Sequence, residues 1–304
     1  MDADLDTLAT ALYVRIDDAL RADPTLAVQR PKVGIAPKLS DAELLTLAVI
    51  QALLGFVSEA RWLRHARSHL SAAFPYLPRQ SGYNKRLRGA SGQLSAIIRL
   101  LALDCDSWAD DTWVMDSTAI ECGRSQETAK RSDLVGWAGY GYCASHSRLF
   151  WGLRLHLVTT TSGLPIVFAL TNPKDDERHV IRDLLEGEPA LLACRPGQIV
   201  VADKGYASAE FETFVNAAGA TLIRPAKQNE KPRPGAELLR PLRQIIESVN
   251  DTLKGQLDLE RHGGRTKAGV IVRVLQRILA MTAAIWHNEH TGQPHLRSLV
   301  AYDH

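Results

Sequence analysis

The chain has 304 residues, of which 45% are hydrophobic and 23% are charged, and its formal net charge is +2. This is the profile of an ordinary globular protein, so it excludes disordered chains, collagen-like repeats and miniature folds held by disulfides. A chain of this length lies near the point at which one hydrophobic core divides into two domains.

Positive charge is concentrated in two segments of this almost neutral chain. Residues 61–103 contain eight basic and no acidic side chains, and residues 224–277 contain twelve basic and six acidic ones. Such a distribution favours a polyanion that is bound by particular surfaces rather than by the whole molecule. Two solvated faces are the alternative explanation.

The first hundred residues show the periodicity of helices. Apolar residues recur at three-to-four spacing between residues 5 and 20, which predicts an amphipathic helix. Ser40 and Glu43 match a capping box and predict a helix that runs to about Gly55, and a further helix begins near Ser58. We therefore expect a helical N-terminal region.

A cluster of basic residues lies near the end of this region. Lys85, Arg86 and Arg88 follow a loop that is marked by Pro75 and Pro78. Helices separated by short basic loops commonly hold phosphate groups. These three side chains are therefore predicted to bind a phosphate-bearing partner.

From about residue 112 the pattern becomes that of a sheet with helices. The predicted strands cover residues 112–120, 150–160, 164–171, 198–203 and 220–224, and the predicted helices between them cover 176–186 and 207–218. This order predicts an antiparallel meander that continues into parallel βαβ units, in an α/β fold with a mixed five-stranded sheet flanked by helices. A long insertion, residues 121–149, separates the first two strands.

Two long helices are expected at the end of the chain, over residues 241–254 and 267–287. The longest apolar run, residues 44–57, is too short and too often interrupted to span a membrane. The first residues are acidic, unlike a secretory signal, and the four cysteines are scattered as in a reducing compartment. We therefore expect a cytoplasmic protein without membrane contact.

Two aspartates lie at positions where a carboxylate needs an explanation. Asp116 lies in the middle of the first predicted strand among apolar residues, where it is costly unless it is paired or bound to a cation. Asp203 ends the short apolar strand, and ligands of open α/β sheets collect at the carboxyl ends of strands. If the two strands are neighbours, the two carboxylates face each other within reach of a metal ion.

A third acid is suggested by helix geometry. Arg243, Glu247, Asn250 and Lys254 are spaced four, three and four residues apart, so they form a polar stripe beside the apolar one. An exposed ion pair between Arg243 and Glu247 is the alternative explanation. Three carboxylates can hold two divalent ions ~3.5–4 Å apart for in-line displacement at a phosphate, and Mg²⁺ suits this task.

Three motifs together carry a family resemblance. They are Val114-Met-Asp-Ser-Thr118, Val200-Val-Ala-Asp-Lys-Gly-Tyr206 and Arg243-x3-Glu247-x6-Lys254. In this order, and on these elements, they resemble the motifs of DDE transposases of bacterial insertion sequences over about residues 110–290. One departure is Arg240, which stands where many relatives have a tyrosine.

The resemblance implies an RNase H-like catalytic domain. It also implies a metal-binding catalytic triad of Asp116, Asp203 and Glu247 that holds two Mg²⁺ ions, for which Mn²⁺ can substitute. Arg243 and Lys254 would then hold DNA phosphates near the metal ions.

The domain organisation expected from this resemblance has three parts. Residues 1–108 form a helical region that binds DNA ends, residues 109–290 form the RNase H-like DDE catalytic domain, and residues 291–304 form a C-terminal tail. The partners are double-stranded DNA, both terminal inverted repeats and target, and a second copy of the chain on that DNA.

The expected function is DNA-mediated transposition. The protein would hydrolyse a phosphodiester at the transposon ends and use the exposed 3′ hydroxyl to attack target DNA. Two alternatives are a catalytically silent DNA-binding regulator and an RNase H-like nuclease without strand transfer. The three acids argue against the regulator, because a protein that only binds DNA gains nothing from acids beside phosphates.

Overall fold

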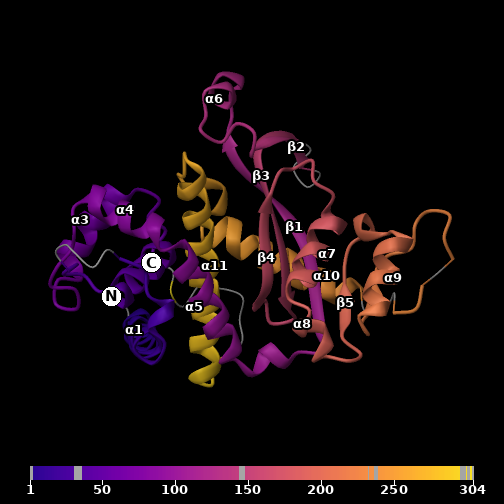
Figure 1. Cartoon of the computed structure of the whole chain (residues 1–304), viewed down its shortest axis with the longest axis horizontal. Coiled ribbons are helices and arrows are strands. Elements are labelled where there is room, and N and C mark those ends of the chain that lie inside the picture. The colour runs from indigo at the N-terminus through magenta and orange to yellow at the C-terminus, as the bar shows by residue number, and fades with distance from the viewer. Residues whose placement is uncertain are drawn as a thin grey trace. The chain divides into compact units, whose positions relative to one another are not determined.

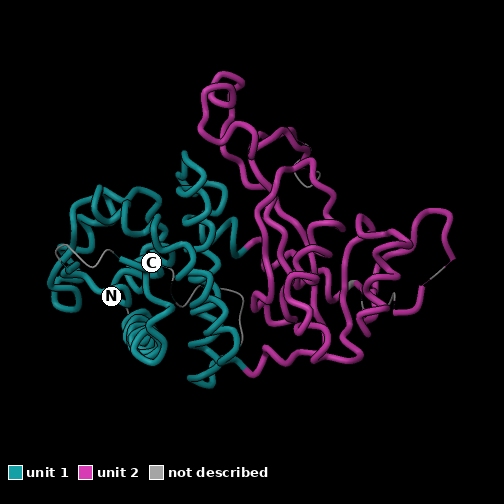
Figure 2. Tube along the Cα trace, in the orientation of Figure 1, with its two compact units in different colours: residues 1–105, 252–304 teal, residues 106–251 magenta. Residues whose placement is uncertain are grey.

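The computed structural model describes residues 3–30, 36–143, 148–231, 233–235, 239–294, 299 and 302 (Figure 1). The chain forms two compact units, of which one comprises residues 1–105 and 252–304 and the other residues 106–251 (Figure 2). The first unit thus contains segments from both ends of the chain, and the second is an uninterrupted segment.

The first unit is helical. Its long helices are α1 (Ala3–Ala22), α2 (Asp41–Leu53), α3 (Glu59–His69), α4 (Gln80–Gly89), α5 (Ser91–Leu103) and α11 (Lys267–His290). The capping box at the start of α2 is present, since Ser40 and Glu43 each accept a hydrogen bond from the other's backbone N–H. The helical N-terminal region predicted from the sequence is confirmed.

Helix α11 is the central helix of the first unit. It is long and apolar enough to cross a membrane, but 83% of its apolar window is buried inside the structure. A helix that is apolar on all sides needs neighbours on all sides, and α1, α2, α4 and α5 pack against it. Contacts therefore group α11 with the N-terminal helices, whereas the sequence analysis assigned it to the domain 109–290.

The predicted C-terminal tail, residues 291–304, is described only in part. Residues 295–298, 300, 301, 303 and 304 lie outside the described residues. The hydroxyl group of Tyr302 donates a hydrogen bond to Asn288 Oδ1 at 2.8 Å, which fixes part of this segment to α11.

A buried ion pair ties α11 to the N-terminal helices. Arg273 of α11 pairs with Glu59 of α3, and their side chains are only 8% and 7% exposed. Arg273 also donates to Gln276 Oε1 at 2.8 Å, and Gln276 Nε2 donates to the Ala48 carbonyl of α2 at 2.6 Å. Asn84 Nδ2 of α4 donates to the Glu59 carboxylate at 2.6 Å. This network joins four helices in the interior.

The second unit contains a mixed sheet. Its strands are β1 (Thr112–Gly123), β2 (Gly139–Cys143), β3 (Arg148–Thr160), β4 (Pro165–Thr171), β5 (Ile199–Val201) and β6 (Thr221–Ile223). Strand β1 pairs antiparallel with β3 along one edge and parallel with β5 along the other, and β6 continues the sheet parallel to β5. The expected α/β class and mixed sheet are confirmed.

The described part of the sheet has six strands rather than the five expected. The additional strand, β2, comes from the insertion 121–149, which also contains the short helix α6 (Gln126–Lys130). Strand β2 pairs with the first part of β3, and β4 pairs with the second part. Because β2 contains two glycines and alternates only weakly in hydrophobicity, its strand signal was absent from the sequence pattern.

Helices cover both faces of the sheet. The remaining helices are α7 (Glu177–Gly187), α8 (Ala190–Ala193), α9 (Ala209–Ala217) and α10 (Leu239–Asp251). Apolar residues of α7, α8 and α9 share one core with Trp113 and Met115 of β1. The apolar stripe of α10 packs on the other face, on Val114, Val201 and Ile223. Alternate residues of β1 thus point to α7 and to α10.

Replacing Glu59 by Leu tests the buried network of the first unit. We expect a loss of about 3–5 kcal/mol in the free energy of unfolding, because the Arg273 charge is left buried without its partner. A double variant that also carries Arg273→Met should recover part of this loss, because the buried charge is then replaced by an apolar side chain. Urea unfolding measures both, with Glu186→Leu, which removes an exposed ion-pair partner on α7, as the control. Equal effects of Glu59→Leu and Glu186→Leu would contradict the assignment.

Candidate active site

The parallel pairing of β1 and β5 brings Asp116 and Asp203 to the same place. Val114 pairs with Val201 in the register of the two strands. Asp116 lies two residues further along β1, and Asp203 lies two residues beyond Val201, the last residue of β5. Side chains two residues apart share a face of a sheet, and neighbouring strands lie ~4.8 Å apart. The register therefore brings Asp116 near the extended backbone at Asp203, close enough for the Asp203 carboxylate to raise the pKa of Asp116.

The environment of Asp116 disfavours its charge. The pKa of Asp116 is raised to about 6, with burial as the largest cause and the nearby carboxylates of Asp203 and Glu177 as smaller ones. Hydrogen bonds from the Ser117 backbone and from Asn250 act in the opposite direction. Asp116 is half-buried and the neighbouring Asp203 is exposed, and two acids that repel each other are the arrangement that a bound cation would stabilise.

Helix α10 contacts this site through one amide side chain. Asn250 Nδ2 donates a hydrogen bond to Asp116 Oδ2 at 2.8 Å. Glu247 precedes Asn250 by three residues and so lies on the same side of α10, ~4.5 Å away along the helix axis. The helix therefore carries the third predicted acid within one turn of the contact with Asp116.

In this conformation Glu247 is engaged elsewhere. Arg243 Nε donates to Glu247 Oε1 at 3.0 Å, and the two side chains are 80% and 58% exposed. Among the described residues, no group of three or more His, Cys, Asp and Glu side chains is arranged to hold a metal ion. The structure thus brings together Asp116 and Asp203 and leaves Glu247 in the exposed ion pair that was the alternative explanation.

The helical signature extends beyond α10. The helix ends at Asp251 and is followed by a π-helical segment, Thr252–Gln256, which contains the half-buried Lys254. The sequence analysis placed Lys254 on one continuous stripe with Glu247, but the π-helical turn ends that periodicity. Lys254 also belongs to the other compact unit. The side chain of Arg240 lies outside what the structure describes.

Two site residues escaped the sequence analysis. Glu177, the first residue of α7, accepts a hydrogen bond from Ser117 Oγ at 2.9 Å and pairs with Arg154 of β3. Arg154 also donates to Ser117 Oγ at 3.2 Å. This cluster fixes the residue next to Asp116 from the opposite face of the sheet. An acid at the start of a helix that follows a strand was the available signal, and it was too general to single out Glu177.

Tyr206 adds a buried donor beside the acids. Its side chain is fully buried, and its hydroxyl has no hydrogen-bond partner among the described residues. Burial, followed by the charges of Glu177, Asp116 and Asp203, raises the pKa of Tyr206 well above its usual value. Tyr206 lies in the core that α7, α8 and α9 share with Trp113 and Met115 of β1, and an unpaired buried hydroxyl there costs ~1–3 kcal/mol.

The donor set fits a magnesium ion. Mg²⁺ requires only one or two protein carboxylates and completes its shell with water and substrate phosphates. Asp116 and Asp203 meet this requirement. The Asp203 carboxylate is oriented by the Gly205 N–H, which donates to its Oδ1 at 2.7 Å. Glu247 can join them only when it leaves Arg243, and an exposed pair of this spacing is worth only ~0.3–0.5 kcal/mol.

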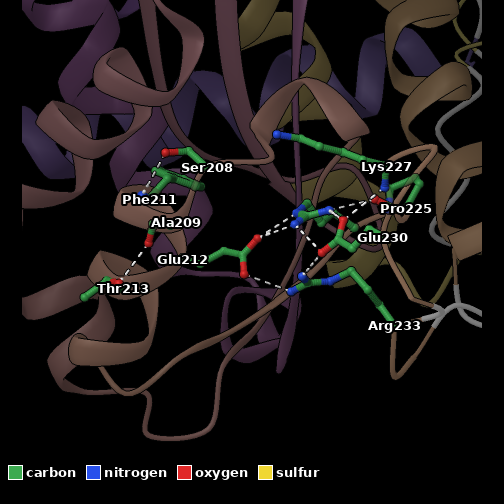
Figure 3. A network of polar contacts seen from close by, with 10 residues as sticks. Ser208, Ala209, Phe211, Glu212, Thr213, Pro225, Lys227, Glu230 and Arg233 are labelled. Carbon is green, nitrogen blue, oxygen red and sulfur yellow. Dashed lines mark hydrogen bonds and ion pairs between the residues drawn. The ribbon is translucent and has the colours of Figure 1, made fainter.

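An ion-pair ring fixes the segment between β6 and α10. Arg224, just after β6, binds Glu212 of α9 and Glu230, and Arg233 binds the same two acids (Figure 3). The four N–O distances range from 2.6 to 3.0 Å. Lys227 donates its backbone N–H to Glu230. The ring holds this basic segment against α9 and leaves the Lys227 side chain exposed.

The predicted phosphate contacts of the N-terminal region lie on α4. Lys85 and Arg88 are exposed. Arg86 differs, because its guanidinium donates to the Leu39 carbonyl at 2.6 Å and to Asp41 at 2.7 Å. Arg86 therefore holds the start of α2, a structural role that the sequence analysis did not foresee. The residues before Lys85 are also helical rather than part of a loop, since α4 begins at Gln80.

Comparison with known protein families identifies the family of this chain. A family model described as a transposase DDE domain matches residues 108–283, which is more than half of the chain. The matched segment contains Asp116, Asp203 and Glu247. A search of curated proteins finds no significant match.

Replacing Asp116 by Asn tests the electrostatics of the site. The folded state raises the pKa of this carboxyl from 3.8 to about 6, so its contribution to stability is present below pH 3.8 and is lost as the pH rises through 6. In EDTA at pH 7.5 we therefore expect Asp116→Asn to be about 1–3 kcal/mol more stable than the wild type. Thermal unfolding across this pH range measures the difference, and the exposed Asp133→Asn is the control. A less stable Asp116→Asn at pH 7.5 would refute the electrostatic account.

Proposed function

This chain belongs to the transposase DDE family, and from that premise we propose that it is a DNA transposase that cuts the ends of a mobile element and joins them to target DNA. The observation that supports this best is the β1–β5 register together with the effect of the Asp203 charge on the pKa of Asp116, which put the two acids near each other. The family supports a transposase-type enzyme that acts on DNA. The two-step chemistry, the metal dependence and the residue roles are our proposal.

The proposed reaction has two displacements at phosphorus. A water oxygen attacks the phosphorus at the element end, a new P–O bond forms and the P–O3′ bond breaks. The water gives up one proton, and the released 3′ oxygen takes up a proton to become the 3′ hydroxyl. The 3′ hydroxyl then attacks a target phosphorus, a new P–O bond forms, and the target 3′ oxygen leaves with the proton. Each step exchanges one P–O bond for another, so no energy source is required.

Asp116, Asp203 and Glu247 would hold two Mg²⁺ ions, for which Mn²⁺ can substitute. When bound, these ions lower the pKa of the attacking hydroxyl and stabilise charge on the leaving oxygen. The Asn250 amide and the Gly205 N–H orient the two aspartates beforehand.

Arg243 and Glu247 exchange partners in this proposal. A DNA phosphate that approaches α10 offers Arg243 a second bidentate partner, in competition with the exposed Glu247 carboxylate. Released from Arg243, Glu247 turns toward Asp116 along the side of α10 that it shares with Asn250. Substrate binding would thereby complete the acid cluster, and Lys254 would hold a further phosphate.

The remaining partners follow from the same proposal. The exposed Lys85 and Arg88 of α4 would contact the terminal inverted repeats, as would other cations of residues 61–103. Acting on two ends at once calls for a homo-oligomer on DNA, in its simplest form a dimer. We place the protein in the cytoplasm, on the nucleoid when it is bound to DNA, and assign it no membrane partner.

Replacing Glu247 by Gln tests the proposed function. We expect DNA binding to be kept and cleavage to fall at least ~100-fold, because a metal ligand is removed while the basic surfaces are intact. Glu186→Gln is the matched control, since Glu186 is also an exposed acid paired with an arginine four residues before it, Arg182. The assay incubates the wild type and both variants with labelled DNA from the flanks of the gene, a target plasmid, and Mg²⁺ or EDTA.

The outcomes of this assay separate the candidate functions. Metal-dependent nicking and joining by the wild type and Glu186→Gln, but not by Glu247→Gln, is the result expected for a transposase. Nicking without joining would indicate a nuclease, and binding without cleavage would indicate a regulator. Full activity of Glu247→Gln would refute the role of Glu247.

A further inference from the structure

The first unit contains a groove that the acid cluster does not explain. It is an open cavity of about 430 Å³ beside the start of α2 and the length of α4. We call it the α4 groove. Its charged and aromatic lining residues are Arg30, Lys38, Asp41, Tyr76, Lys85 and Arg86. Four cations and one anion give the lining a formal charge of +3.

The single acid of the α4 groove is already neutralised. Asp41 is only 5% exposed and pairs with both Arg30 and Arg86. The two arginines are thereby held in place beside the groove, and their second positive charge is left uncompensated. The field inside the groove is therefore positive before any ligand enters.

Among the described residues that line the α4 groove, Lys38 and Lys85 are the cations that do not pair with Asp41. Lys85 is exposed on α4. Lys38 Nζ lies 5.6 Å from the centre of the Tyr76 ring, and Tyr76 is 42% exposed although it is a large aromatic residue. An exposed aromatic ring beside two lysines offers a surface for a sugar and cations for the phosphates on either side of it.

Two glycines open one side of α4 to this groove. Gly82, Lys85, Arg86 and Gly89 are spaced three, one and three residues apart, so they lie on one side of the helix. Glycine in a helix is ~1 kcal/mol less favourable than alanine. A Cβ atom would meet nothing within 4 Å at Gly89, and at Gly82 only Pro78 Cβ at 3.5 Å. Packing within the protein therefore does not require glycine at either position.

We propose that the α4 groove binds the phosphate backbone of duplex DNA. Lys38 and Lys85 contact phosphates, Arg30 and Arg86 supply the fixed positive field, and the glycines let the sugar-phosphate chain approach the α4 backbone closely. The inference rests on the proposed function in taking DNA as the partner. It adds a defined site, which includes residues outside the segment 61–103.

The test measures binding of the full-length protein to a fluorescein-labelled DNA duplex of mixed sequence. EDTA prevents cleavage, and the anisotropy is recorded at several salt concentrations. Each lost phosphate contact removes ~0.9 from the slope of log K against log[salt], or about fivefold in affinity at ~0.15 M salt. We expect this loss for Lys85→Ala and for Lys38→Ala, and none for Lys130→Ala, which removes an exposed lysine of α6 outside both basic segments.

Gly89→Ala tests the close approach independently of charge. We expect weaker DNA binding together with an unchanged or higher melting temperature. Gly92→Ala on α5 is the matched control, because a Cβ there also meets nothing within 4 Å and Gly92 does not line the groove. A variant that fails to fold would reveal itself by its melting temperature, so reduced binding with intact stability is specific to the site.

Several results would overturn the proposal. Unchanged affinity and salt slope for Lys38→Ala, Lys85→Ala and Gly89→Ala would do so. Displacement of the labelled duplex by a polyglutamate peptide as readily as by unlabelled DNA would instead identify an acidic polypeptide as the partner. If the wild type cleaves DNA and the groove substitutions change neither binding nor cleavage, this inference alone is refuted. If the groove substitutions weaken DNA binding but the wild type does not cleave, only the transposase chemistry is refuted.

Discussion

The burial of the Asp116 carboxyl near a second acid, Asp203, is the constraint on which the account of this protein depends. Backbone hydrogen bonds between β1 and β5 set the register of the two strands and so bring the chain at Asp203 near Asp116. The sheet thus keeps one carboxyl with a pKa near 6 in a position where an apolar residue would be more stable. Much of the second unit serves this arrangement: α10 reaches it through Asn250, and the Arg154–Glu177 pair fixes Ser117 beside it.

The third acid differs from these two in how it is held. Asp116 and Asp203 are positioned by a sheet, which has few alternative conformations, whereas Glu247 is positioned by an exposed helix and a weak ion pair. A site with two fixed ligands and one that arrives with the substrate would be complete only when DNA is bound. Such an order of assembly limits cleavage to correctly bound DNA, and it is consistent with an acid cluster that is incomplete in this structure.

The fold and the two aspartates were predictable from local patterns, and the rest was not. Strand periodicity and the turn after Asp203 are encoded within a few residues, so β1 and β5 were located from the sequence. Glu177 reaches the site only through the packing of α7, and its neighbours gave no distinguishing signal. The place of α11 depends on contacts with helices more than 150 residues earlier in the chain, such as Arg273 with Glu59. The side-chain rotamer of Glu247 determines which partner it contacts, and the residue spacing in the sequence does not determine that rotamer.

The most direct test of the account is to locate the metal ion in the protein without DNA. Fe²⁺ in place of Mg²⁺, with ascorbate and hydrogen peroxide, produces hydroxyl radicals that cut the polypeptide near the bound ion, and mass spectrometry of the fragments identifies the cuts. We predict cuts close to residues 116 and 203 that disappear in Asp116→Asn and Asp203→Asn and that excess Mg²⁺ suppresses. Cuts elsewhere in the chain, or cuts that persist in both variants, would contradict the assignment of these two aspartates to a metal site.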